Sequence, residues 1–352
     1  MIEIISIEEV EKWDAIVRQQ KNYDVFYLAS YAKAFEQQGE GQPILIHCVD
    51  GEQSAVSVMF KRDIADCEYF KDVLPAGKYF DLISPYGYGG FWSEQGITER
   101  MLEEYATYCR ENNYICEFVR FELYGDYYRK YTGEVETRTH NVVRSLEMPI
   151  DEMLMDFEHK VRKNIKHAQR EGLQILIEEN GDHLEDFLRI YYGTMERNDA
   201  SDTFYFNREF FEKLNEMTGH YVYVYVIYQE KVISAELIIF GTENAYSYLG
   251  GTDSEYFYVR PNDFLKFEAI KWLKERGLKN FVLGGGYGAD DGIFRYKKSL
   301  APNGIVDFYI GRNIFDKKMY EKMIEIRTDE KEMLDGEYFP VYRAREIQKS
   351  EG

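Results

Sequence analysis

Two strands that end on glycine, a helix start and a lysine follow one another between residues 246 and 300. The first strand ends at the glycines of 246–251, and a helix begins near Asn262. Lys297 follows a second strand, which ends on Gly284, Gly285 and Gly286. Glycine lets a backbone approach a ligand closely, and the unpaired N–H groups of a helix start attract anions. We therefore expect a site for a phosphorylated molecule or for an acyl group activated as an ester or a thioester.

Other reaction classes leave motifs that this sequence lacks. It has no Gly-x-Ser-x-Gly turn for a serine nucleophile, no His-Glu-x-x-His or Cys-x-x-Cys pair for a metal and no Walker-type phosphate loop. Direct transfer, in which an amine attacks a bound activated carbonyl, needs only orientation, hydrogen-bond donors for the oxyanion and a proton acceptor. Four acidic residues are candidates for that proton acceptor: Asp253, Glu268, Asp290 and Asp291.

A basic cluster contrasts with the net charge of −20. Nucleic-acid-binding proteins usually carry a basic surface, so a polyanion would have to bind a local patch here. The candidate patch lies in a predicted helical segment, 151–172, and consists of Lys160, Arg162, Lys163 and Lys166. It predicts either contact with RNA or phosphate, or a solvated helix face, which is the usual role of a charge run.

The length of 352 residues suits two domains, because single hydrophobic cores stop growing near about 250–300 residues. A strand, a glycine-bearing turn, a helix and a short apolar strand occur in this order twice, at 79–119 and at 246–282. We therefore predict a duplicated α/β (α+β) fold with two lobes, 1–148 and 149–345. Each lobe should have a mixed, mainly antiparallel sheet with flanking helices, and a cleft between two such lobes is a common place for a ligand.

The motifs of residues 155–310 resemble the Fem-type aminoacyltransferases of peptidoglycan synthesis, a branch of the GNAT acyltransferase superfamily. The resemblance implies a GNAT-like fold in each lobe. It also implies that Arg197 binds a phosphate of a nucleotide-linked muropeptide and that Lys297 lies near the reacting carbonyl or its leaving group. Tyr296 replaces a phenylalanine of the family and is implied to line the substrate site. The similar segments are the basic helix with its exit at Gly172, Tyr192-Gly-Thr-Met-Glu-Arg197, the helix from Pro261 to Gly277, Phe281-Val-Leu-Gly-Gly-Gly286 and Phe294-Arg-Tyr-Lys297.

The N-terminal half departs from the family pattern. Phe35 stands where the family has a phosphate-binding lysine, and the nearby Lys33 is the candidate substitute. The turn 84–90, Ser-Pro-Tyr-Gly-Tyr-Gly-Gly, replaces a basic-Gly-Pro turn, and Tyr86 and Tyr88 of this turn either line a substrate pocket or pack internally. These departures indicate a less characterised GNAT-like branch.

We expect an acyltransferase that moves an aminoacyl or acyl group from an activated donor to an amine of a cell-wall precursor or of a polysaccharide precursor. The acyl donor would be aminoacyl-tRNA or acyl-CoA, used as a co-substrate, with no bound cofactor and no metal. The aminoacyl donor is narrowly favoured, because Arg260-Pro-Asn-Asp lacks the glycines of the usual GNAT pyrophosphate loop. The alternatives are an acyl-CoA-dependent N-acyltransferase of an amino sugar and a non-catalytic protein that binds a precursor.

We also expect a cytoplasmic protein without a transmembrane segment. The acidic N-terminus lacks the basic region of a signal peptide, and no stretch approaches the roughly 18 apolar residues of a membrane span. The four cysteines have no paired spacing, which favours a reducing compartment: Cys48, Cys67, Cys109 and Cys116. The sequence predicts no oligomeric state.

Overall fold

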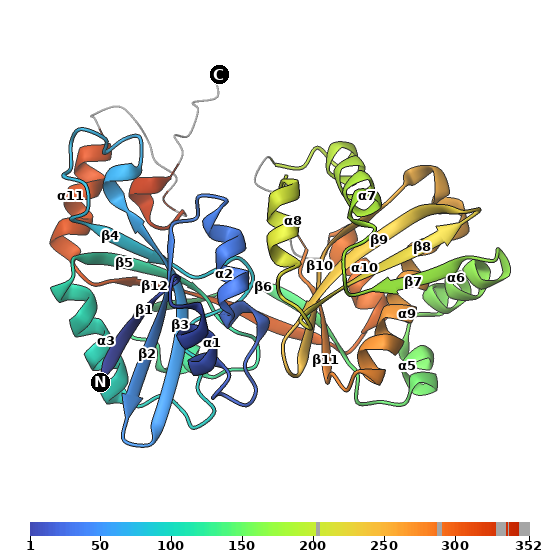
Figure 1. Ribbon diagram of the computed structural model, residues 1–352, viewed down its shortest axis with the longest axis horizontal. Helices are drawn as coiled ribbons and strands as arrows, with labels where there is room; N and C mark the ends of the chain where they lie inside the picture. Colours follow the sequence, from blue (N-terminus) through green and yellow to red (C-terminus); the bar gives the residue numbers. More distant parts are fainter. Residues whose placement is uncertain (202–204, 287–290, 329–335, 337, 345–352) are drawn as a thin grey trace. The chain divides into compact units, whose positions relative to one another are not determined.

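The computed structural model describes residues 1–201, 205–286, 291–328, 336 and 338–344. The chain divides into two compact units (Figure 1). Unit 1 contains residues 1–21, 26–138 and the described chain from Tyr309 onward, and unit 2 contains 22–25 and 139–308. Within the described residues, no helix combines the length and the hydrophobicity that a bilayer crossing requires.

Unit 1 is a mixed sheet flanked by helices. The strand order is β1-β2-β3-β4-β5-β12, and only the β4/β5 pair among these described strands is parallel. Thr98 caps the helix α3 by accepting from the backbone N–H of Met101, and α3 packs its apolar side chains against the sheet. The strands are β1 (Ile2–Ser6), β2 (Gln42–Asp50), β3 (Gln53–Asp63), β4 (Phe80–Ile83), β5 (Tyr114–Arg120) and the part of β12 (Ile305–Ile314) from residue 309 onward; the helices are α1 (Val10–Val17), α2 (Ala29–Glu36), α3 (Glu99–Glu111), α4 (Tyr127–Lys130) and α11 (Lys317–Arg327).

Unit 2 repeats this plan. Its strand order is β6-β11-β10-β9-β8-β7, in which β10 and β11 are parallel and the other described pairs are antiparallel. The strands are β6 (Glu134–Ser145, from residue 139), β7 (Gln174–Glu178), β8 (Tyr221–Tyr228), β9 (Lys231–Phe240), β10 (Asn244–Thr252) and β11 (Asn280–Gly284); the helices are α5 (Ile150–Asp156), α6 (His159–Arg170), α7 (Leu184–Arg197), α8 (Arg208–Leu214), α9 (Pro261–Glu275) and α10 (Gly292–Leu300).

Strand β8 shows how both faces of this sheet are covered. Side chains alternate between the faces of a strand, and β8 alternates tyrosine with valine. The tyrosine face meets α7, where the rings of Phe187 and Tyr223 lie 5.1 Å apart. The valine face, with Val222, Val224 and Val226, joins the core that also contains residues of α6 and α9. The predicted fold class, α/β with mixed, mainly antiparallel sheets and flanking helices, is confirmed in each unit.

The compact units divide the chain differently from the predicted lobes at its C-terminal end. Residues Ile310–Ile314 of β12 pair with β5, so this segment belongs to unit 1. Beyond it, Tyr342 and Arg343 reach the carboxylate of Asp81 on β4, which is fully buried. The division differs from the predicted one because Tyr342 and Arg343 contact Asp81, which lies far from them in the sequence. Residue spacing alone does not reveal such contacts.

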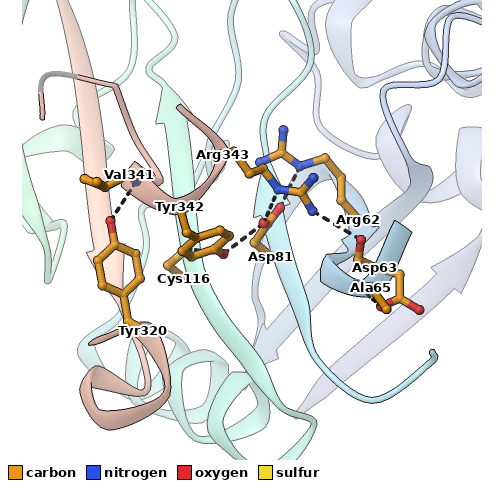
Figure 2. Close-up of polar contacts among 9 residues, drawn as sticks. All are labelled: Arg62, Asp63, Ala65, Asp81, Cys116, Tyr320, Val341, Tyr342 and Arg343. Atoms are coloured by element: carbon orange, nitrogen blue, oxygen red, sulfur yellow. Dashed lines mark hydrogen bonds and ion pairs between the residues drawn. The ribbon is translucent and has the colours of Figure 1, made fainter. Parts of the chain in front are cut away.

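The Asp81 network joins three elements of unit 1 (Figure 2). Asp81 accepts from Arg62 Nε and from Arg343 Nε, each at 2.6 Å, and from the hydroxyl of Tyr342 at 2.9 Å. Burial raises the pKa of Asp81, but the two guanidinium groups outweigh it and hold the pKa below its ordinary value. A buried carboxylate is tolerated only when it is paired and hydrogen-bonded in this way.

Residues 22–25 enter unit 2 through a second buried carboxylate. Asp24 accepts from the hydroxyl of Tyr246 at 2.6 Å and from the side-chain amide of Asn244 at 3.2 Å. Both partners are neutral, and burial raises the pKa of Asp24 to about 6. This short segment is therefore fixed to β10 by hydrogen bonds from neutral partners.

Replacing Asp81 should destabilise unit 1 strongly. In the Asp81→Ala variant, Arg62 and Arg343 would remain beside each other without their carboxylate, and breaking a buried ion pair typically costs about 3–5 kcal/mol. Urea unfolding followed by circular dichroism measures this change. Asp66→Ala is the matched control, because Asp66 is exposed and surface changes stay within about 0.5 kcal/mol. Equal midpoints for the two variants would show that the network does not stabilise the fold.

Candidate functional site

A cavity of about 290 Å³ lies inside unit 2, between the strands β9 and β10 and the helices α7, α9 and α10. Four predicted site residues line it: Arg197, Asn262, Tyr296 and Lys297. They come from three helices and are up to 100 positions apart in the sequence, counted from 197 to 297. The strand–helix–strand order around α9 therefore brings these residues to one place.

Lys297 lines this cavity and has a pKa well below the ordinary value of a lysine. Its ammonium group donates to the carbonyl of Gly285 at 2.6 Å. Burial, with a smaller effect of the nearby Lys266 ammonium, lowers the pKa of Lys297 to about 8, against the opposing effects of Glu236 and Asp291. A lysine with such a pKa changes its protonation state near neutral pH, as acid–base catalysis requires.

The three glycines at the end of β11 lie where a larger residue would collide with neighbouring atoms, and Gly284 lies beside this lysine. Gly284 has a φ of +82°, which favours glycine, and a side chain there would begin 3.1 Å from Lys297 Nζ. A side chain at Gly285 would begin 2.9 Å from the carbonyl oxygen of His140, and one at Gly286 would begin 2.6 Å from the carboxylate of Asp291. None of the three glycines lines this cavity or the larger one described below. Internal packing therefore explains why glycine occupies these positions, and a direct ligand contact from them stays a prediction.

A buried ion pair also lines the cavity, and neither of its residues was selected from the sequence. Lys266 of α9 donates to Glu236 Oε1 at 2.5 Å and to the hydroxyl of Ser247 at 2.6 Å. Glu236 is 6% exposed and Lys266 is 9% exposed. All three residues line the cavity with Lys297. One carboxylate and two ammonium groups thus line the same small cavity.

A second cavity, of about 580 Å³, lies at the N-terminus of α9. It shares Phe257, Asn262 and Tyr296 with the first cavity. Cationic side chains that line it are Lys160, Arg260 and Arg295, and the acidic ones are Glu158 and Asp263. The volume suits a small-molecule ligand or part of a larger one.

Two buried polar atoms beside the second cavity lack hydrogen-bond partners among the described residues. They are Oδ1 of Asp263 and the hydroxyl of Tyr296. The other oxygen of Asp263, Oδ2, accepts from the side-chain amide of Asn164 at 2.6 Å, and burial raises the pKa of Asp263. A carboxylate at this position disfavours a second anion next to the first turn of α9.

Arg197 and Asn262 are held by contacts around β10. Arg197 donates to the carbonyl of Thr252 at 3.0 Å, and its guanidinium lies 5.3 Å from the ring centre of Phe257. The side-chain oxygen of Asn262 accepts from the hydroxyls of Thr252 and Ser234. Both side chains are thereby fixed at the cavity wall.

The basic helix α6 has mixed roles. Lys160, Lys163 and Lys166 are exposed, and Lys160 also lines the second cavity. Arg162 instead donates to the carbonyls of Met155 and Phe157, so its guanidinium fixes the chain that precedes the helix. Phosphate contacts by these residues stay a prediction.

Three predicted site residues lie in unit 1. Lys33 is a half-buried residue of α2. Tyr86 is 38% exposed and stacks on the buried Phe35, whereas Tyr88 is 9% exposed and packs edge-to-face on Phe26. Tyr88 therefore has a packing role, and substrate contacts by Lys33 and Tyr86 stay predictions.

Three of the four acidic residues suggested as proton acceptors have other partners in the structure. Asp253 pairs with Lys231, and Glu268 pairs with Lys271. Asp291 caps α10 by accepting from the backbone N–H of Phe294. Asp290 lies outside the described residues. None of the described three lines either cavity.

Residues 155–298 match the family model of the acetyltransferase (GNAT) domain. FemX has a similar structure, with a TM-score of 0.66 and 15% identity over 91% of this chain and 99% of FemX. The C-terminal domain of a putative lysylphosphatidylglycerol synthetase from Agrobacterium fabrum is also similar, with a TM-score of 0.56 and 12% identity over 89% of this chain and 93% of that domain. No curated protein matches the sequence.

These comparisons confirm the predicted acyltransferase of GNAT type. The domain match covers Arg197, Asn262, Tyr296 and Lys297, and the similarity to FemX shows that the two proteins share a fold. The chain is therefore an acyltransferase that contains a GNAT domain.

Lys297 should titrate near pH 8 in the folded protein. At that pH about half of the Lys297 side chains should be uncharged, because burial and the ammonium of Lys266 disfavour the protonated form. Trace labelling with an amine-reactive anhydride over a range of pH, followed by mass spectrometry, gives the midpoint without depending on absolute accessibility. In urea the midpoint should return to the ordinary lysine value of about 10.4. Identical midpoints in the two conditions would contradict the buried site.

Proposed function

We propose that this GNAT acyltransferase moves an aminoacyl group, or another acyl group, from an activated donor to an amine of a cell-wall precursor or of a polysaccharide precursor. The observation that carries the proposal is Lys297, which lines a cavity together with Glu236 and Lys266 and whose pKa is lowered by burial to about 8. Partial removal from water strengthens the interaction of this cation with charge that develops on a reacting carbonyl. A lysine that served only as a solvated surface charge would keep its ordinary pKa.

In this mechanism an ester or thioester carbonyl of the acyl donor binds beside Lys297. The amine of the acceptor attacks the carbonyl carbon, and the negative charge that appears on the carbonyl oxygen is stabilised by the Lys297 ammonium. A carbon–nitrogen bond forms, and the carbon–oxygen or carbon–sulfur bond to the leaving group breaks. Lys297 can then protonate the departing oxygen or sulfur.

The second cavity supports a donor that carries phosphate groups. Lys160, Arg260 and Arg295 line this cavity, and their positive charges favour an anionic group there. Aminoacyl-tRNA and acyl-CoA both carry phosphate groups. Asp263 in the first turn of α9 works against a pyrophosphate at the usual GNAT position, which favours the aminoacyl donor.

We infer that the acceptor supplies an amine nitrogen as the nucleophile. We also infer that the reaction takes place in the cytoplasm. The described cysteines are free thiols, which fits a reducing compartment.

Phe35, which replaces the phosphate-binding lysine of Fem-type enzymes, is buried among aromatic side chains. This observation favours a second candidate function, a non-catalytic protein that binds a precursor. Turnover with a panel of aminoacyl-tRNAs and acyl-CoAs separates the two candidates.

Replacing Lys297 should abolish most turnover and leave the protein folded. Lys297→Met removes the cation opposite the developing oxyanion, and the loss of one such group typically lowers kcat by about 10²–10³-fold. The measurement is acyl transfer by the purified variant to an amine acceptor. Lys298→Met is the matched control, because Lys298 is the next residue of α10 but lines neither cavity. Equal kcat values for both variants would remove Lys297 from the mechanism.

Charge reversal on α6 should distinguish the two acyl donors. The double variant Lys163→Glu/Lys166→Glu should raise the KM for aminoacyl-tRNA and reduce its salt dependence, because exposed lysines bind a phosphate backbone through released counterions. The KM for acyl-CoA should stay unchanged. Lys317→Glu/Lys318→Glu, on the exposed surface of α11, is the control. An unchanged KM for an aminoacyl-tRNA substrate would show that α6 does not contact RNA.

A further inference from the structure

We propose that Glu236 is the residue that accepts the proton of the attacking amine, and that Lys266 positions its carboxylate. This inference rests on the proposed acyl transfer, because it assigns a role within that reaction. It names a carboxylate that lines the cavity, which Asp253, Glu268 and Asp291 do not. The argument depends on the burial of the pair, on its hydrogen bonds and on its place in the smaller cavity.

Glu236 is an unusual residue for its strand. From Val232 to Phe240, β9 is otherwise apolar except for Ser234, and every residue of that stretch is buried. Glu236 pairs in register with Val224 of β8, whose side chain belongs to the core beneath α9. Directly opposite residues of neighbouring strands share a face, so the carboxylate lies on the side of the sheet that α9 covers.

A purely structural role explains this pair poorly. Taking a carboxylate and an ammonium out of water carries a penalty of several kcal/mol per ion, and well-packed apolar side chains are often at least as stable. Apolar side chains already lie beside the pair: the ring centre of Phe281 is 5.3 Å from Lys266 Nζ, and Leu265 lines the same cavity. A buried ion pair that lines a cavity in this setting is a candidate for function.

The hydrogen bonds leave one side of the carboxylate open. Lys266 donates to Oε1 of Glu236 and also to Ser247 Oγ, which fixes the ammonium from two directions. No described residue donates to Oε2. Because Glu236 and Lys297 line the same cavity, the geometry assigns Oε2 to the incoming nitrogen and the Lys297 ammonium to the carbonyl oxygen.

The charged groups that face Glu236 have complementary tasks. Lys266 faces it from α9 and Lys297 from α10, while Ser247 of β10 contributes a hydroxyl to the cluster. The Tyr296 hydroxyl is neutral, because burial raises its pKa well above the ordinary value. A carboxylate that can take a proton and an ammonium that can give one therefore share the cavity, which is the arrangement that acid–base catalysis of acyl transfer requires.

The proposed step balances in atoms and charge. The neutral amine attacks the acyl carbon, and its proton moves to Glu236 Oε2 as the carbon–nitrogen bond forms. The tetrahedral intermediate then breaks the bond to the ester oxygen or thioester sulfur, which takes a proton from Lys297. Transfer of the Glu236 proton to neutral Lys297, through the cavity or through solvent, restores both groups.

Removing the carboxylate tests the assignment. Glu236→Gln keeps the size of the side chain and should lower kcat by about 10²–10⁴-fold, the usual contribution of a positioned proton acceptor, with little change in KM. Glu268→Gln is the matched control, because Glu268 also pairs with a lysine but lies outside both cavities.

A double variant guards against a folding effect. Glu236→Gln alone leaves the Lys266 ammonium buried without a counterion, whereas Glu236→Gln/Lys266→Gln replaces the ion pair by two amides. The double variant should be folded by circular dichroism and as inactive as the single one. Lys266→Gln should lower kcat, and Lys266→Arg should restore part of it, which indicates a positioning role.

The outcomes separate this inference from the function on which it rests. Turnover within about threefold of wild type in Glu236→Gln or in the double variant, well below the loss expected for a proton acceptor, would overturn the assignment. If the wild-type protein transfers no acyl group from any tested aminoacyl-tRNA or acyl-CoA, the proposed function itself fails, and the role of Glu236 fails with it.

Discussion

An ammonium group that is removed from water needs an opposite charge or a hydrogen-bond acceptor nearby. Unit 2 places two such ammonium groups, those of Lys266 and Lys297, around one cavity. Lys266 is compensated by a carboxylate, while Lys297 has a backbone carbonyl and a lowered pKa instead. The difference defines the site, because Lys266 is paired with a carboxylate, whereas Lys297, with its lowered pKa, can lose its proton near neutral pH. The surrounding strands and helices are arranged so that both charges reach the same small space.

Part of this site could be predicted from the sequence. Asn262 occurs at a helix start and Lys297 follows a glycine-ended strand, and this local pattern already indicates a ligand, whereas the resemblance to Fem-type enzymes implied Arg197. The order of elements then suffices to bring them together. The glycines at 284–286 were also visible, but their neighbours in space were not, so the sequence could not show that packing against His140 and Asp291 already requires them.

Glu236 and Lys266 could not be predicted in the same way. Each is a single charged residue in a segment that is otherwise apolar or amphipathic, and each taken alone looks like an ordinary surface residue. Their pairing depends on the register of β9 against β8 and on the rotation of α9 over the sheet. The one indication in the sequence was a carboxylate in the middle of an apolar strand. Its role becomes clear only when Lys266 is found beside it. The Asp81 network is a similar case, because Arg343 is 262 positions away from its carboxylate.

That long connection bears on how the polypeptide is made. The ribosome synthesises Asp81 early, yet Tyr342 and Arg343 emerge only after all of residues 139–308, which build most of unit 2. Domains generally fold as units during synthesis, but until residues 309–343 have been translated unit 1 lacks the strand that pairs with β5 and two of the three side chains that donate to Asp81. Unit 2 can therefore complete its folding before unit 1, although the synthesis of unit 1 begins first. This reverses the usual order, in which folding proceeds from the N-terminus to the C-terminus.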